Sequence, residues 1–368
     1  GASAAVTTLS ASNLTWQNAG LDYIDGASPD TSDDLNVYDK FHHFVINYSN
    51  FGKPRSGGTA IWKYQGELLD DATYPDDPRI SDYRDAGAYV RHINGYKLLI
   101  VPDQNSQRIN MYRFLSSSNT PTDERTAPYA RFLRETNRGH TPDNFEIWVD
   151  TNLNGSIDST NPNCTAAGSN GEEACTTTFV ADPSGEFFAW YMDTAGNIWT
   201  VGGTSGAYKL YEFYLQGSGA PTWSFAAGKF KTWPLPAAFT GGTGTIYPLR
   251  LLYDVANDAL FVTGYTAAKP KDTAGIGFGG VGGGFIGTQI LRYDNWSTQP
   301  QTAATAQCTI TLADVPSPPP ASGVLGKGPR AFDLAHGLLV TENDFTNRID
   351  YYYAYDSRCP QGTVTPSY

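Results

Sequence analysis

Short apolar runs alternate with polar turns along most of the chain, and one such sequence pattern occurs twice in clear form. Leu98–Val101 leads through a polar turn to Gln107–Tyr112, and Leu338–Thr341 leads in the same way to Asn347–Tyr352. Short runs rich in Val, Ile and Tyr that end at Asn, Asp or Gly are typical of β-strands. The recurrence therefore predicts a chain built from repeated sheet units.

Weaker copies of this sequence pattern lie at residues 44–64, 198–213 and 260–293. Most copies follow a further apolar run and a tight turn, and these runs are Tyr89–Ile93, Phe187–Tyr191, Leu249–Tyr253 and Arg330–Leu334. The turn Asn94-Gly95 strongly favours a two-residue hairpin. A fourth strand is expected at Tyr129–Leu133, Lys229–Trp233 and Gln307–Leu312. The predicted unit is therefore a four-stranded antiparallel sheet.

Repeated four-stranded units are the building blocks of a β-propeller, in which each blade buries its faces against its neighbours. We therefore expect an all-β fold, a single β-propeller of five to seven blades over residues 1–368, with six blades favoured. Five units are evident directly, and a strand at Asn144–Val149 suggests a sixth. Alternatively, Ala5–Leu9 would close the ring by pairing with the last blade.

The step Asn347-Arg348-Ile349, with Gln107-Arg108-Ile109 in the other clear unit, resembles the Asn-Arg-Ile step of the NHL group of six-bladed propellers. The resemblance covers residues 88–115 and 329–355, and the other units depart from it because they lack the Arg. It implies the fold and no particular activity, since propellers serve as binding modules, lyases, lactonases and scaffolds.

The composition suits a large β-domain. The chain has 38 Gly, 23 Pro and 23 Tyr, and charged residues are only 17%, so turn formers and flat aromatic side chains outweigh helix formers. Insertions are expected where the repeat is interrupted, at about 22–40, 150–178 and 268–287. No stretch approaches the ~18 consecutive apolar residues of a membrane span, so none is expected.

The cysteines bear on the compartment, and four of them allow three pairings. Cys164 and Cys175 bracket a polar loop that would gain from a local disulfide, which leaves Cys308 to pair with Cys359. Four free buried thiols are the alternative. Paired cysteines predict a secreted, extracellular or periplasmic protein. In a eukaryotic source, the sequons would make it a glycoprotein; they begin at Asn13, Asn47, Asn154, Asn163 and Asn295.

The formal net charge of −12 argues against nucleic acid binding, which needs clustered Lys and Arg. Acidic residues gather between Asp22 and Asp77, which suggests a solvated acidic face, with divalent cation binding as the alternative. The chain has no Cys-x-x-Cys-His segment, and the glycine run Gly275–Phe285 lacks the flanking strand and helix of a dinucleotide site. Haem and nucleotide cofactors are therefore not expected.

The clearest chemical motif runs from Asp150 to Asp158. Oxygen ligands at Asp150, Asn152, Asn154 and Asp158, with Gly155 at a sharp bend, suit calcium, which takes about six to eight oxygens. The segment resembles the first nine positions of an EF-hand or dockerin loop.

This segment departs from both loops after its ninth position, where Asn161 replaces the acidic ligand and Pro162 prevents a following helix. We therefore expect a structural calcium ion in a free-standing turn, completed by Glu172 or Glu173. A plain Asx-rich turn without metal is the alternative.

Catalytic candidates come from residue types alone. Propeller lyases that act on uronic-acid polysaccharides combine His, Tyr and Arg, because Arg neutralises the carboxylate while Tyr or His moves the proton. The candidates of these types are His42, His43, His92 and Arg108. For each His, the alternative is a hydrogen-bonded residue at a strand end. His140 and Arg348 complete the set whose position would reveal a shared site.

Two functions are compatible with these features. We favour a non-catalytic secreted or cell-surface module that binds a glycan, peptide or protein partner through Tyr and Trp at blade edges. The alternative is a carbohydrate-active enzyme, a polysaccharide lyase or hydrolase, with its site in the axial funnel. Convergence of the His and Arg candidates at one mouth of the ring favours the enzyme, and scatter favours the binding module.

Overall fold

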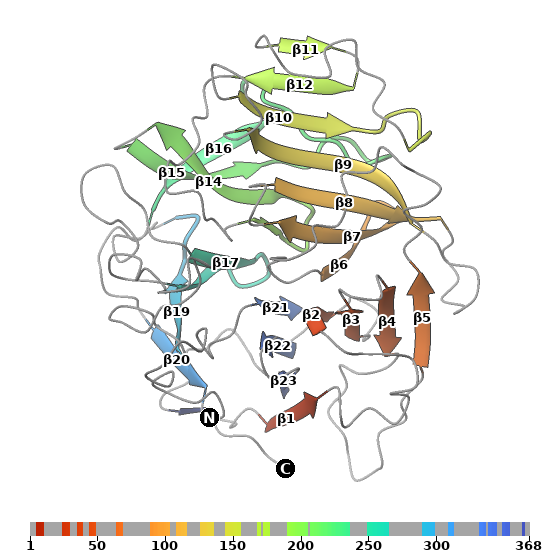
Figure 1. Cartoon of the computed structure of the whole chain (residues 1–368). Coiled ribbons are helices and arrows are strands. Elements are labelled where there is room, and N and C mark those ends of the chain that lie inside the picture. Colours follow the sequence, from red (N-terminus) through yellow and green to blue (C-terminus); the bar gives the residue numbers. More distant parts are fainter. Residues whose placement is uncertain are drawn as a thin grey trace, which may run out of the picture.

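Figure 1 shows the computed structural model of the chain, which describes its strands and several of their turns. The described backbone covers residues 5–10, 24–29, 35–39, 44–48, 64–68, 89–103, 108–115, 126–135, 144–155, 168–170, 172–176, 190–204, 207–235, 249–264, 289–298, 308–312, 331–335, 338–343, 348–353 and 363–364. Side chains are described for residues 89–101, 109–115, 126–132, 146–155, 172, 174, 190–200, 209–235, 251–262, 291–298, 333 and 334.

The described strands form five sheets, each named here after its first, inner strand. The β2 sheet has the order β2-β3-β4-β5, with bounds Ile24–Pro29, Leu35–Asp39, Phe44–Tyr48 and Tyr64–Leu68. The β6 sheet has the order β6-β7-β8-β9-β10-β12-β11, with bounds Tyr89–Ile93, Tyr96–Asp103, Arg108–Phe114, Thr126–Glu135, Asn144–Val149, Glu173–Thr176 and Gly168–Asn170.

The other three sheets follow the same plan. The β13 sheet has the order β13-β14-β15-β16, with bounds Tyr191–Met192, Ile198–Thr204, Ala207–Phe213 and Phe230–Pro234. The β17 sheet has the order β17-β18-β19-β20-β24, with bounds Leu249–Asp254, Ala259–Gly264, Gln289–Asp294, Cys308–Leu312 and Thr363–Val364. The β21 sheet has the order β21-β22-β23-β1, with bounds Ala331–Ala335, Leu338–Asn343, Arg348–Tyr353 and Ala5–Ser10.

The predicted all-β class is confirmed for these sheets, which are antiparallel except where β24 joins β20 in parallel. None of the described residues forms a helix that could cross a membrane. Most strands expected from the apolar runs are present, including the fourth strands β9, β16 and β20. Of the expected runs 59–64 and 187–191, only the last residue of each lies in a described strand. Asn94 and Gly95 both have positive φ, 52° and 84°, as the predicted two-residue hairpin requires.

Two segments, residues 144–149 and 22–40, show what apolar patterning resolves less well, and a third confirms an expectation. Residues 144–149 form β10, which pairs with β9 and extends the β6 sheet outward (Figure 1). Residues 22–40 were expected to form an insertion, but they contain β2 and β3, which pair with each other. Their sequences are too polar for the strands to be recognised from apolar patterning. Ala5–Ser10 pairs with Arg348–Tyr353, so the predicted pairing of the N-terminal run with the last sheet is confirmed.

The inner strands face one another around the middle of the molecule, where β2 contacts β6 and β21, and β17 contacts β13 and β21 (Figure 1). Large aromatic side chains fill the space between neighbouring sheets. Phe132 of the β6 sheet packs against Trp190 and Phe213 with ring centroids 6.0 and 5.6 Å apart. Trp199 of the β13 sheet packs against Tyr253 of the β17 sheet at 4.6 Å. The core therefore lies between sheet faces.

Candidate functional site

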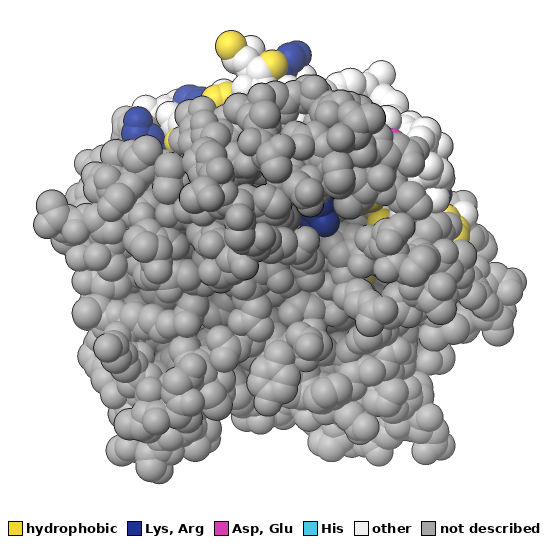
Figure 2. Space-filling view, turned by 45° about the horizontal axis from the view of Figure 1, so that its top comes forward, with side chains coloured by type: hydrophobic (Ala, Val, Ile, Leu, Met, Phe, Trp, Pro, Cys, Tyr) yellow, Lys and Arg dark blue, Asp and Glu magenta, His cyan; other side chains and the backbone are white. Residues whose placement is uncertain are grey.

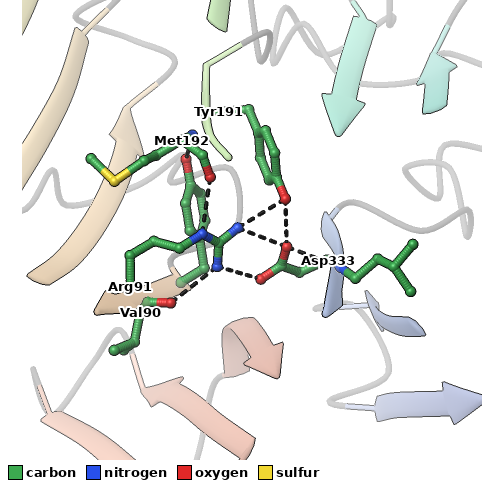
Figure 3. Close-up of polar contacts among 7 residues, drawn as sticks. Val90, Arg91, Tyr191, Met192 and Asp333 are labelled. Atoms are coloured by element: carbon green, nitrogen blue, oxygen red, sulfur yellow. Dashed lines mark hydrogen bonds and ion pairs between the residues drawn. The ribbon is translucent and has the colours of Figure 1, made fainter. Parts of the chain in front are cut away.

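Three inner strands bring polar side chains together in the middle of the molecule (Figure 3). Arg91 comes from β6, Tyr191 from β13 and Asp333 from β21. Arg91 and Asp333 are each the middle residue of a five-residue strand that leads into a hairpin, so they occupy equivalent positions of their sheets. We call these three residues, with Tyr89 and Met192, the Arg91 cluster.

Arg91 donates hydrogen bonds from all of its nitrogens. Its two Nη atoms bind the Asp333 carboxylate in a bidentate pair at 2.6 and 2.8 Å. Nη2 also donates to Tyr191 Oη at 2.9 Å, and Nη1 to the Val90 carbonyl at 3.0 Å. Nε donates to the Met192 carbonyl at 3.0 Å. All five N–H groups of the guanidinium are thus used within the protein.

The two tyrosines complete the cluster. Tyr191 Oη donates to Asp333 Oδ1 at 2.8 Å, and Tyr89 Oη accepts a hydrogen bond from the Met192 amide at 2.6 Å. The guanidinium carbon lies 4.6 Å from the ring centroid of Tyr89 and 5.2 Å from that of Tyr191, in range of cation–π attraction. Arg91 and Asp333 are 4% and 1% exposed, so the charges are held almost entirely away from water.

Burial and charge pairing set the protonation states. Burial alone would lower the pKa of Arg91, but the Asp333 carboxylate raises it above its ordinary value. Burial raises the pKa of Tyr89 and Tyr191 well above 10, and Asp333 adds to the effect. Both phenols are therefore protonated and Arg91 is charged at neutral pH. The cluster is therefore a buried ion pair in which every N–H group of Arg91 already donates a hydrogen bond. It joins the β6, β13 and β21 sheets.

The candidates expected from the sequence are distributed differently. His92 is exposed and pairs in register with Lys97 near one end of β7. Arg108 pairs with Asp103 at the other end of β7, about 20 Å away at ~3.3 Å per residue. These two candidates therefore do not meet. His42, His43 and His140 lie outside the described residues, and for Arg348 only the strand position is described.

Sequence reasoning did not single out Arg91 or Asp333, although a signal was present. Both stand in the middle of an apolar first strand of a repeat unit, with opposite charges at comparable positions of Tyr89–Ile93 and Ala331–Ala335. A charge inside such a strand needs a buried partner, and the partner was available 242 residues away.

The predicted calcium loop is described from Asp150 to Gly155. Asp150 is buried, and its carboxylate accepts hydrogen bonds from the amides of Asn154 at 3.0 Å and Gly155 at 2.8 Å. Asn152 Oδ1 also accepts from the Asn154 amide, at 3.0 Å. Leu153 and Gly155 have positive φ, 63° and 79°, which curls the turn around the carboxylate. Burial raises the pKa of Asp150.

Glu172, expected from the sequence to complete this loop, lies against it. Its Oε1 accepts hydrogen bonds from the Thr151 amide at 2.7 Å and the Asn152 amide at 3.3 Å. Carboxylate and amide oxygens are the kind of ligand that calcium binds, but those described here accept backbone N–H groups, as in the Asx-rich turn given as the alternative. Within the described residues no three His, Cys, Asp or Glu side chains gather around a metal position, and Asp158 lies outside them. Calcium at this loop stays a prediction.

The predicted disulfides are not tested, because the side chains of all four cysteines lie outside the described residues. Cys175 lies on β12 and Cys308 on β20, with their side chains outside the description, as are Cys164 and Cys359 altogether. On the face that Figure 2 shows, the described Lys and Arg side chains form separate spots and not one continuous patch. The run Gly275–Phe285 lies outside the described residues.

Comparisons with known proteins give distant likenesses. No protein family model and no curated protein sequence matches the chain. Similar solved structures include a luciferin-regenerating enzyme, at 9% identity and TM-score 0.38 over 95% of both chains. A PQQ-bound aldose sugar dehydrogenase from Streptomyces coelicolor has 11% identity and TM-score 0.36, over 93% of this chain and 79% of its own.

A further similar structure is the WD40 domain of coronin from Toxoplasma gondii, at 8% identity and TM-score 0.34, over 92% of this chain and 70% of that one. Similarity at this level carries no argument about activity. The chain's own sheets and buried contacts therefore provide the basis for a functional proposal.

Proposed function

We propose that this chain is a five-bladed β-propeller that acts as a non-catalytic binding module for a glycan, peptide or protein partner. Contacts run from β6 through β2, β21 and β17 to β13, and Arg91 returns from β13 to β6 through its bond to Met192. This circuit supports five blades around one axis, with β10, β12 and β11 as a lateral extension. Secretion, two disulfides and a structural calcium ion belong to the same proposal.

The saturated Arg91 cluster is the observation that favours binding over catalysis. An enzyme with its site on the axis needs a donor or a titrating group that can reach a substrate. Every N–H of Arg91 is already bound, and both phenols have pKa values far above neutrality. The ion pair described near the axis thus connects blades, which favours loops and blade edges as the binding surface.

The test combines a glycan array with a product assay on acidic polysaccharides. The binding module retains one or more ligands and releases no shortened or unsaturated product. Steady product formation by the purified chain would instead support the alternative, a polysaccharide lyase or hydrolase.

A matched variant locates any activity. R91M with D333L replaces both charges by apolar side chains of similar size, which is often neutral for folding because no charge is left unpaired. Ligand binding is expected to survive in this variant. Loss of both binding and turnover in a folded R91M/D333L protein would place the functional site on the axis and contradict the proposal.

A further inference from the structure

A second buried polar group, centred on Glu212 of β15, lies where the β13 sheet meets the β17 sheet. Glu212 is 7% exposed, and its Oε1 accepts a hydrogen bond from Asn197 Nδ2 at 3.1 Å. Its Oε2 accepts one from Trp233 Nε1 at 3.0 Å. Both partners are neutral, so the carboxylate is hydrogen-bonded without a direct ion pair to either.

The orientation of these two donors is fixed. Asn197 Oδ1 accepts a hydrogen bond from the Leu215 amide at 3.0 Å, which leaves Nδ2 to face Glu212. An indole N–H can only donate. Each oxygen of Glu212 therefore meets a donor, and both hydrogen bonds favour the ionised carboxylate. Burial and the nearby Asp193 oppose ionisation, and burial is the largest of these effects, so the neutral carboxyl is favoured overall.

Several charged and titratable groups face Glu212. Asp193, at the end of β13, opposes its negative charge, and Lys231 on β16 favours it. Tyr214 and Tyr253 also interact with its charge, and Tyr253 donates to Asp258 at 2.8 Å. Burial raises the pKa of Glu212 to about 7, and Asp193 adds to this effect.

The side chains held by this group make the contact between the two sheets. Trp233 lies 6.3 Å from Trp296 of the β17 sheet, measured between ring centroids. Trp199 lies 4.6 Å from Tyr253 and stacks on Trp233 at 6.1 Å. Asp193 accepts a hydrogen bond from Trp199 Nε1 at 2.9 Å. The two carboxyls therefore position the aromatic rings that bridge the sheets.

We propose that Glu212 is a proton-dependent latch between the β13 and β17 sheets, which holds them more firmly when it is protonated and loosens them when it ionises. Acidification then tightens the contact, because the neutral carboxyl is tolerated among buried aromatic rings and no longer repels Asp193. As the pH rises the buried charge appears and the contact weakens.

The direction in which stability changes with pH follows from proton binding to the folded and unfolded states. The pKa of Glu212 is raised from an ordinary 4.5 to about 7, so the folded protein binds the proton more tightly than the unfolded chain. The stabilisation is complete below pH 4.5 and is lost as the pH rises through 7. One proton can change the unfolding equilibrium constant by up to ~10-fold per pH unit within this window.

The experiment compares urea unfolding of the wild-type protein and E212Q from pH 4.5 to 8. The wild type is expected to lose stability relative to E212Q by up to ~100-fold in the unfolding equilibrium constant, with the loss ending near pH 7. Hydrogen exchange of the Leu215 and Trp296 amides is expected to accelerate more with pH in the wild type than in E212Q.

Parallel pH profiles of the wild type and E212Q would overturn the proposal. Should E212Q fail to fold, W233F provides a separate test, because loss of a donor to the ionised carboxyl moves the titration of Glu212 to higher pH. Carboxyl-carbon NMR of the wild type and W233F then decides. The proposal fails if no Glu carboxyl titrates near 7 or if W233F leaves that midpoint unchanged.

Discussion

The Arg91 cluster and the group around Glu212 both bury carboxylates beside aromatic rings, but they compensate the negative charge differently. Asp333 is matched by a bidentate guanidinium, so the pair carries no net charge. Glu212 and Asp193 are held by indole, amide and backbone N–H groups, which have no charge to offer. The first arrangement is insensitive to pH near neutrality, and the second titrates.

The difference also separates two ways of joining sheets. The ion pair connects side chains 242 residues apart across the middle of the molecule, and it is costly to break because either partner alone is an unpaired buried charge. The Glu212 group connects the β13 and β17 sheets through contacts between aromatic rings, and small shifts of these rings do not leave a charge unpaired. The middle of the molecule is thus expected to be rigid while the β13–β17 contact responds to conditions.

The largest expected effect comes from breaking the ion pair. R91A leaves Asp333 buried without its counter-charge and is expected to lower the free energy of unfolding by about 3–5 kcal/mol. Urea unfolding at pH 7 measures the loss. The double variant R91M/D333L is the control and should recover most of the stability; a loss in R91A below about 1 kcal/mol would show that the pair does not join the sheets.

At Asp150 a bound calcium ion would be a third way to compensate the charge of a buried carboxylate, and removing the metal tests it. If calcium binds the turn, ~100-fold excess over its Kd adds about 2.7 kcal/mol to stability, and a chelator removes it. Thermal unfolding with and without chelator measures this, with D150N as the variant that abolishes the response. Identical transitions and no bound metal by elemental analysis would leave the Asx-turn interpretation.

A smaller effect is expected when Asp193 loses its indole donor. W199F keeps most of the ring but removes the hydrogen bond to a buried carboxylate, with an expected loss of about 1–3 kcal/mol. Burial raises the pKa of Asp193, and the indole lowers it because its hydrogen bond favours the ionised carboxylate, so the loss should shrink as acidification protonates Asp193. A loss that stays constant from neutral to acidic pH would mean that the donor does not serve the ionised form.

The smallest effect is expected at Tyr191. Y191F removes a hydroxyl that bridges Asp333 and Arg91, but the ion pair persists, so the expected loss is about 1 kcal/mol. Because the pKa of Tyr191 is far above 10, this loss should not change between pH 5 and 8. A pH-dependent loss would contradict the assignment of the Arg91 cluster as the insensitive one.

Much of the fold could be predicted because strands follow local alternation of apolar and polar residues. The run Tyr89–Ile93 and the turn Asn94-Gly95 identify β6 and its hairpin without further information. Patterning is less informative for β2, Ile24–Pro29, where few apolar residues mark the strand. It also cannot tell whether Asn144–Val149 begins a sheet or extends one, since that depends on backbone pairing with β9.

The candidate sites were harder to predict because their partners are remote. Arg91 and Asp333 are recognisable as charges inside apolar strands, but only the arrangement of the sheets makes them a pair. Glu212 offers a similar local signal between Tyr211 and Phe213, yet its raised pKa depends on burial against the neighbouring sheet. The loop at Asp150 was local and therefore visible in the sequence, including its contact with Glu172.

The pairing of β1 with β23 has a consequence for how the chain folds during synthesis. Ala5 pairs with Tyr353, so the β21 sheet cannot be completed until β23 has left the ribosome. Until then β1 has no partner in the sheet, and once β23 has emerged, its outer edge stays open to pairing with other chains until β1 docks. Contacts of such long sequence separation form slowly. Aggregation during expression should therefore depend on how fast β1 docks, and added β1 peptide should compete for the open edge.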